Sequence, residues 1–214
     1  SRVREIFVSR GGSCEPIPDC RALSPGSGPT GADEFGLNEF LLYHGCRAAS
    51  IDDILQTGFD TRRTGERNGR FFGRGTYFTD VAAKADTYAD SSSGQKCMIV
   101  AHVCLGKVIR ATKAMPSLEA PPREEDRHCD VSQLFDTVVG EDAAHGGVLD
   151  HREYVIYDSG QALPSYLLWY RHADACDCFR CRPALGTRNV GTPRSLLPMV
   201  SPPACPELRS AQYL

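Results

Sequence analysis

Four residues near the ends of predicted strands carry side chains that could act together: one imidazole, two phenol rings and one carboxylate. They are His44, Tyr77, Tyr88 and Glu153. A carboxylate can stabilise a developing positive charge, and two aromatic faces can hold a flat group between them. Taken singly, each residue also fits an ordinary role as a satisfied histidine, a core aromatic or a solvated glutamate. Composition and spacing alone therefore predict no particular reaction.

A second group of residues, with side chains that can bind metal, lies toward the C-terminus: His172, Cys176, Cys178 and Cys181. Three thiols and one imidazole within ten residues could form a structural Cys3His zinc site, with Cys205 as a spare ligand. The single residue between Cys176 and Cys178 is a tighter spacing than the usual two, and the segment is rich in proline. Unpaired thiols or disulfides are therefore favoured over the zinc site.

Three common nucleotide and hydrolase motifs are excluded. The segment Gly73-Arg74-Gly75-Thr76-Tyr77-Phe78 begins like a dinucleotide fingerprint, but Phe78 stands where the third glycine is needed. The chain also contains no Walker lysine motif and no Gly-x-Ser-x-Gly nucleophile elbow. The sequence therefore predicts neither a Rossmann domain, nor a P-loop enzyme, nor an α/β-hydrolase.

Charge and composition narrow the class of protein further. The 214 residues include 24 basic and 27 acidic side chains, a net charge of -3 that argues against nucleic-acid binding through bulk charge, although a local patch stays possible. No apolar run approaches the roughly 18 residues of a membrane span. The ten cysteines are accompanied by no Asn-x-Ser/Thr sequon. We therefore expect an intracellular protein, nuclear or cytoplasmic, without a membrane segment, whose oligomeric state the sequence leaves open.

Glycine and proline divide the chain into three parts. They supply ten of residues 1–36 and eight of residues 173–214, but only 16 of the 136 residues in 37–172. The middle part matches average usage and is predicted to be the folded domain. Residues 1–36 are predicted to be an arm with one strand over Val3–Val8. Residues 173–214 are predicted to be an extended Cys/Pro-rich tail.

Within the middle part, short strands outnumber helices. Strands are predicted over 40–43, 97–104, 153–157 and 166–170. One helix is predicted to begin at a capping box that starts with Ser50 and to end before Gly58, and a second to run from Asp80 to Tyr88. The order is not a regular βαβ alternation, so the predicted fold class is α+β.

The sequence segments around His44, Tyr77, Tyr88 and Glu153 resemble the poly(ADP-ribose) polymerase (PARP) catalytic domain. The matching segments occur in the family's order and span about 38–170. They are Asn38–Gly45 with Gly58–Asp60, Gly69–Tyr88, Val103–Lys107, Phe135–Val139, and Glu153–Asp158 with Gln161, Pro164 and Tyr166–Leu168.

This resemblance implies the ADP-ribosyltransferase fold, in which two packed, mainly antiparallel sheets flanked by short helices hold NAD in a cleft. It implies that His44, Tyr77 and Glu153 are the catalytic His-Tyr-Glu set. The cofactor-binding residues that it implies are His44, Gly45, Tyr77, Phe78, Lys84 and Tyr88. His44 would bind the adenine ribose, the Gly45 backbone would hold the nicotinamide amide, and Tyr88 would stack on the nicotinamide ring.

The implied chemistry agrees with these residue types. When nicotinamide leaves NAD, the ribose becomes oxocarbenium-like, and a nearby carboxylate such as Glu153 would stabilise its charge. NAD is then a substrate, and the expected partners are protein acceptors, including the chain itself. Elongation to poly(ADP-ribose) is slightly favoured because polymer-forming members of the family generally keep a glutamate at this position.

Two positions depart from the family pattern and keep alternatives open. Cys46 follows the His-Gly pair, where serine or threonine is usual, and Ala85 stands where a serine commonly binds the nicotinamide amide. A missing hydrogen bond of this kind costs about 0.5–1.5 kcal/mol. The alternatives are mono-ADP-ribosylation of protein or nucleic-acid ends, and an inactive nucleotide-binding or interaction module.

Overall fold

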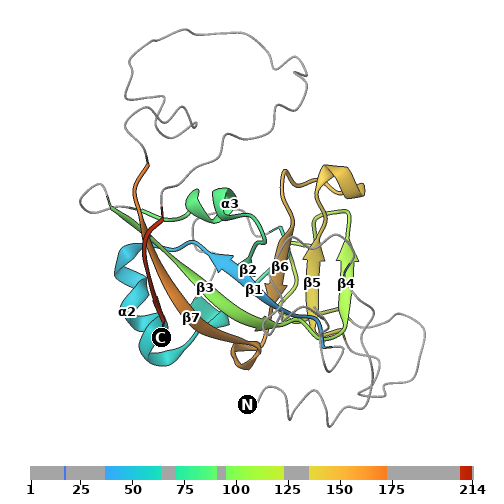
Figure 1. The fold of residues 1–214 in the computed structure, drawn as a ribbon. Helices are drawn as coiled ribbons and strands as arrows, with labels where there is room; N and C mark the ends of the chain where they lie inside the picture. Colours follow the sequence, from blue (N-terminus) through green and yellow to red (C-terminus); the bar gives the residue numbers. More distant parts are fainter. Residues whose placement is uncertain are drawn as a thin grey trace, which may run out of the picture.

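The computed structural model describes residues 17, 37–63, 71–90, 95–122 and 135–172, together with the backbone of 208–213. Figure 1 shows two sheets packed against each other, with the helices short and peripheral. The strands and helices are β1 (Glu39–His44), α2 (Ala48–Thr57), β2 (Thr76–Phe78), α3 (Ala82–Asp86), β3 (Lys96–Cys104), β4 (Val108–Ala111), β5 (Thr137–Gly140), β6 (Glu153–Ile156), β7 (Ala162–Tyr170) and β8 (Leu208–Tyr213).

Each sheet has four strands. The first has the order β1-β3-β7-β8 and is antiparallel throughout, and the second has the order β2-β6-β5-β4, in which only β4 and β5 run parallel. A two-residue bridge joins the sheets: the Tyr43 N–H donates to the Thr79 oxygen at 2.8 Å and the reverse bond measures 3.0 Å. The predicted α+β class with two mainly antiparallel sheets is confirmed.

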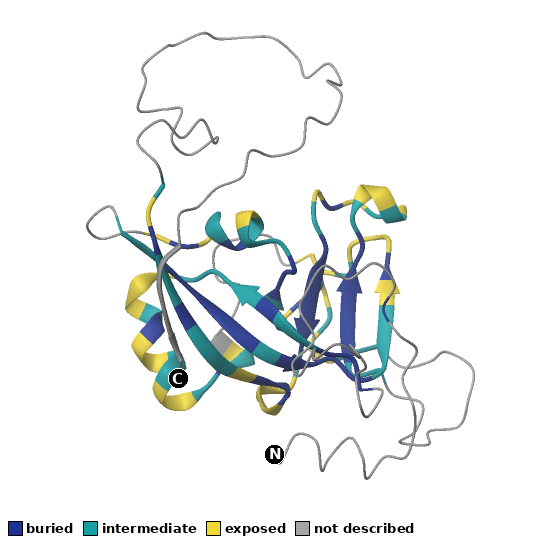
Figure 2. Cartoon of the chain, viewed as in Figure 1, coloured by how far each residue is buried: buried dark blue, intermediate teal, exposed yellow. Residues whose placement is uncertain are grey.

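The main hydrophobic core lies between the two sheets. Leu42 of β1 and Ile99 of β3 pack in one buried cluster with Tyr154 and Ile156 of β6. Val155, which points to the other face of β6, is buried in a second cluster with Phe72. Figure 2 shows β5 and β6 buried along their whole length, as expected of strands covered on both faces.

Helix α2 differs from the prediction at its start and agrees with it at its end. It begins at Ala48, and its N-cap residue Arg47 makes no side-chain capping bond, so the predicted capping box at Ser50 is wrong. A distant carboxylate fulfils the capping role instead, because Asp90 accepts the Ala48 N–H at 2.7 Å. Gly58 ends the helix with φ +81°, and its N–H donates to the Ile54 oxygen.

Helix α3 is shorter than the predicted 80–88 span. It covers Ala82–Asp86, and Val81, not Asp80, stands at its N-cap position without a side-chain bond. The Asp80 carboxylate instead accepts the Tyr154 hydroxyl at 3.2 Å. A tertiary contact with β6 thus takes the carboxylate that the local pattern assigned to helix capping.

The C-terminal side adds a strand that the sequence did not predict, since β8 pairs antiparallel with β7. The predicted strand over Val3–Val8 lies outside the described residues. Among the residues that the structure does describe, every helix is too short or too polar to cross a membrane.

Candidate functional site

The C-terminal end of β1 places His44 against β2 and Gly45 against α3. His44 Nδ1 lies 2.9 Å from the Tyr77 backbone oxygen. Because a carbonyl oxygen only accepts, Nδ1 carries the proton, and in the neutral ring Nε2 is left as an acceptor. Burial lowers the pKa of His44, although the bond to the Tyr77 carbonyl opposes this shift. The ring is therefore a neutral, oriented imidazole whose Nε2 can accept a hydrogen bond from a hydroxyl group.

Gly45 lies in direct contact with the backbone of α3. A Cβ atom at this position would stand 1.8 Å from the Ala85 carbonyl oxygen and 3.2 Å from the Tyr88 Cβ. No residue with a side chain fits there unless α3 moves. Strand β1 and helix α3 therefore approach each other backbone to backbone at the site.

Tyr77 and Phe78 lie next to each other on β2 but have different surroundings. The Tyr77 hydroxyl donates to the Gly73 oxygen at 2.8 Å and accepts from the Phe72 N–H at 3.1 Å. These two bonds fix the hydroxyl end of this half-buried ring. Phe78 is only 2% exposed, and its ring lies 5.5 Å from that of His44. Phe78, one of the expected binding residues, is therefore buried beside His44.

Helix α3 contributes a cation and leads to an exposed aromatic ring. The Lys84 ammonium lies 3.0 Å from a Glu153 carboxylate oxygen and 5.7 Å from the centre of the Tyr88 ring. Burial lowers the pKa of Lys84, but the Glu153 carboxylate and the Tyr88 side chain together outweigh this effect and leave the pKa raised. Tyr88 is 38% exposed, one of few large apolar side chains open to solvent among the described residues. Its exposed face is available for stacking.

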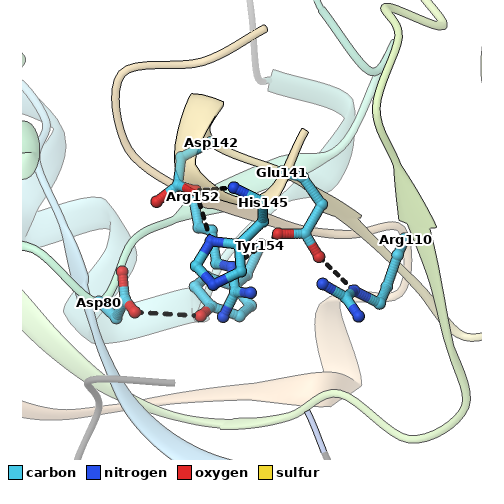
Figure 3. A network of polar contacts seen from close by, with 7 residues as sticks. All are labelled: Asp80, Arg110, Glu141, Asp142, His145, Arg152 and Tyr154. Carbon is cyan, nitrogen blue, oxygen red and sulfur yellow. Dashed lines mark hydrogen bonds and ion pairs between the residues drawn. The ribbon is translucent and has the colours of Figure 1, made fainter. Parts of the chain in front are cut away.

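Glu153 opens β6 beside a buried ion pair. The Arg152 Nε–H donates to Glu141 at 2.7 Å, and Arg110 pairs with the other oxygen of the same carboxylate. The Glu141 side chain is only 1% exposed. Figure 3 shows this network together with the Tyr154–Asp80 bond. The residues on both sides of Glu153 are therefore fixed, which holds the start of β6 in place, while the Glu153 carboxylate itself contacts Lys84.

Ala85, which replaces the expected serine, is 2% exposed and packs with Ala89, Met98 and Tyr170. It offers no hydroxyl to a ligand, and its carbonyl oxygen lies against Gly45. Cys46, the other departure from the family pattern, is a half-buried free thiol. Burial, with a further contribution from Asp90, raises the pKa of Cys46 to about 11. Cys46 is therefore a neutral thiol near pH 7 and offers no nucleophile.

The possible zinc site at the C-terminal side lies mostly outside the described residues. Cys176, Cys178 and Cys181 lie outside the described residues, whereas His172 contacts the Asp86 carboxylate at 3.0 Å. Elsewhere in the described part of the chain, Glu141, Asp142 and His145 bring ligand atoms within 4.8 Å of one another. Both Glu141 oxygens are already paired with arginines, so these residues form a neutralised cluster.

Sequence reasoning missed Glu141 and Asp86 at this site. Glu141 pairs with Arg152 across the sheet, and Asp86 contacts Lys96 of β3 and His172 beyond β7. The adjacent Arg152-Glu153 at the start of an apolar strand was the one available signal. Two charges entering a buried strand require partners, although a single sequence does not say which.

Residues 30–172 match the model of the poly(ADP-ribose) polymerase catalytic domain family. The human protein mono-ADP-ribosyltransferase PARP12 is 30% identical over 134 residues, 63% of this chain and 17% of that protein. The poly [ADP-ribose] polymerase tankyrase of Caenorhabditis elegans is 29% identical over 161 residues, and human protein mono-ADP-ribosyltransferase PARP14 is 31% identical over 138. Each match covers 63% of this chain and 7% of that relative. The chain thus spans a small part of these relatives.

Proposed function

The chain belongs to the poly(ADP-ribose) polymerase catalytic domain family of NAD-dependent ADP-ribosyltransferases, and we propose that it transfers ADP-ribose from NAD to protein side chains. The observation that carries this proposal is the Lys84–Glu153 ion pair, together with the contacts that bring His44 to Tyr77 and Gly45 to the helix that carries Lys84. The chain itself is proposed as one acceptor. These residues need no metal for the bond cleavage described next.

In the proposed reaction, the glycosidic bond between the nicotinamide nitrogen and ribose C1′ breaks, and its electron pair goes to nicotinamide. The ribose becomes oxocarbenium-like, and the Glu153 carboxylate stabilises this charge. The acceptor nucleophile then forms the new bond to C1′ and loses its proton. Holding both groups in position lowers the entropic part of the barrier.

The binding residues follow from the same geometry. We assign Tyr88 and Tyr77 as the aromatic walls for nicotinamide, and His44 Nε2 as the acceptor for a ribose hydroxyl. The backbone of Gly45 is assigned to the nicotinamide amide, because the close approach to α3 leaves no side chain in the way. Lys84 is assigned to orient Glu153.

We further propose that the product can be elongated to poly(ADP-ribose). A second carboxylate function, polarising the hydroxyl of an ADP-ribose acceptor, is open to Glu153. The competing proposal is single-unit transfer, favoured by the similarity to PARP12 and PARP14, whose names describe mono-ADP-ribosyltransferases. A nuclear or cytoplasmic location fits the free thiols Cys46 and Cys97.

Product length separates these proposals. The wild type and Glu153→Gln are incubated with labelled NAD, and the products are resolved on a sequencing-type gel. Glu153→Gln keeps the shape but removes the charge, so we expect ladders to disappear while slow NAD hydrolysis or single-unit transfer survives. Single units from the wild type would favour mono-ADP-ribosylation. Equal NAD turnover in both proteins would remove Glu153 from the catalytic set.

A further inference from the structure

Helix α3 lies at the periphery, near the ends of both sheets (Figure 1), and side-chain contacts tie it to each of them. Lys84 and Asp86 are two residues apart, and at 3.6 residues per turn their side chains point to opposite sides of the helix. Lys84 contacts Glu153 of β6, in the second sheet. Asp86 contacts residues at the end of the first sheet where β3 starts and β7 finishes.

Asp86 gathers three donors on one carboxylate oxygen. The Lys96 ammonium lies 2.6 Å away, the Tyr170 hydroxyl 2.7 Å and His172 Nε2 3.0 Å. Lys96 also donates to the Asp86 backbone oxygen at 3.1 Å, so it satisfies a carbonyl at the C-terminal end of α3. Burial opposes the charged form of Asp86, but these donors, Lys96 foremost, lower its pKa overall. The carboxylate is therefore ionised at neutral pH.

The partners of Asp86 are themselves held in register. Lys96 and Tyr170 are directly paired on β3 and β7, and the Lys96 ammonium lies 6.0 Å from the centre of the Tyr170 ring. The His172 ring stacks on Tyr170 with a centroid distance of 6.3 Å. Asp86 thus anchors α3 to a rigid point of the first sheet.

The position of α3 determines the shape of the nicotinamide end of the proposed cleft. The Ala85 oxygen lies against Gly45 and also accepts the Tyr88 N–H at 3.0 Å. A shift of α3 would move the Tyr88 ring and open the contact with Gly45. The backbone of Glu153 would move less, because Arg152 and Glu141 hold its strand independently, although its partner Lys84 would move with the helix.

We propose that Asp86 is a positioning residue for NAD binding, which fixes α3 to the first sheet through Lys96, Tyr170 and His172 so that Tyr88 and Gly45 form the nicotinamide end of the cleft. This inference rests on the proposed function. Arg152 and Glu141 hold the backbone at Glu153, and only its partner Lys84 moves with α3. Loss of the Asp86 anchor is therefore expected to raise KM for NAD more than it lowers kcat.

Steady-state kinetics of nicotinamide release from NAD tests this role. Asp86→Ala is expected to raise KM for NAD about tenfold, as loss of charge-assisted hydrogen bonds suggests, with kcat within about threefold of wild type. Asp86→Asn keeps an acceptor oxygen, so its KM for NAD should lie between those of the wild type and Asp86→Ala. Lys96→Met should raise KM similarly, and the double variant should add little, because both changes break one anchor.

Ile51→Ala serves as the control for stability. Ile51 is buried on α2, away from α3, so this variant should lower the melting temperature and leave KM unchanged. Unchanged KM in folded Asp86→Ala and Asp86→Asn would overturn the inference alone, as would an equal rise in Ile51→Ala or full additivity with Lys96→Met. Absence of turnover in the wild type would overturn the proposed function and this inference with it.

Discussion

Gly45→Ala is the smallest change that should disable the site, because it adds one methyl group where β1 meets α3. The new Cβ would lie 1.8 Å from the Ala85 carbonyl oxygen, whereas ordinary contacts begin at 3.4 Å. The helix must therefore retreat by about 1.6 Å, the difference between these distances. A misplacement of ~1 Å can cost ~100-fold in rate, so kcat/KM should fall at least that far.

The effect on stability should be smaller than the effect on activity. Overpacking typically costs about 1–3 kcal/mol, which corresponds to a fall of roughly 2–12 °C in the melting temperature of a chain this size. Because α3 is short and peripheral, it can move without unfolding the sheets. We therefore expect a folded protein with very low NAD turnover.

The assay measures nicotinamide release and thermal unfolding on the same preparations. Gly160→Ala is the matched control, because its Cβ would meet Asp158 only at 3.3 Å, a contact that a small adjustment relieves. This variant should keep wild-type kinetics. A Gly45→Ala protein with wild-type kcat/KM would refute the reasoning, since α3 would then not bound the site.

Three further predictions follow from individual contacts. Tyr88→Ala should weaken the binding of NAD and of free nicotinamide together. Loss of an aromatic contact of about 0.5–1.5 kcal/mol corresponds to a rise of roughly two- to twelve-fold in the calorimetric Kd, and the exposed position of Tyr88 should leave the melting temperature nearly unchanged. Loss of stability with unchanged affinity would show a core role. Glu141→Gln leaves the Arg152 charge buried without its carboxylate and should cost about 3–5 kcal/mol in urea unfolding, so a cost below about 1 kcal/mol would contradict the network. The lowered pKa of His44 means that the unfolded chain binds more protons just below its ordinary pKa of about 6.5. This contribution to stability is therefore present above that pH and lost as pH falls through the folded pKa. The free energy of unfolding, measured against pH, should therefore fall less steeply in His44→Gln than in the wild type.

The sequence predicted the elements that local pattern controls. The buried strand over 97–104 and the Gly58 helix end were recognisable because apolar runs and a left-handed glycine are local signals. The start of α2 was wrong because its capping carboxylate, Asp90, lies 42 residues away in the chain. Strand β8 escaped prediction because pairing with β7 stabilises it from outside its own segment.

The residues of the candidate site also divide into those that the local sequence marks and those that depend on distant contacts. His44, Tyr77 and Glu153 were found through motifs that surround them in the chain. Nothing local marked Asp86 or Glu141, because their importance comes from cations on other strands. The burial of Phe78 could likewise not be read from its place beside Tyr77, since alternation along β2 does not say which face meets the core.

The most direct test of the central claim is nicotinamide release from labelled NAD by the purified chain without added metal, measured for the wild type and Glu153→Gln at millimolar NAD. The account predicts that the wild type releases nicotinamide and becomes labelled itself. It also predicts that Glu153→Gln, with its fold intact by circular dichroism, does both far more slowly. A wild-type protein that neither releases nicotinamide nor becomes labelled, while still binding NAD, would contradict the account and would make the domain a nucleotide-binding module.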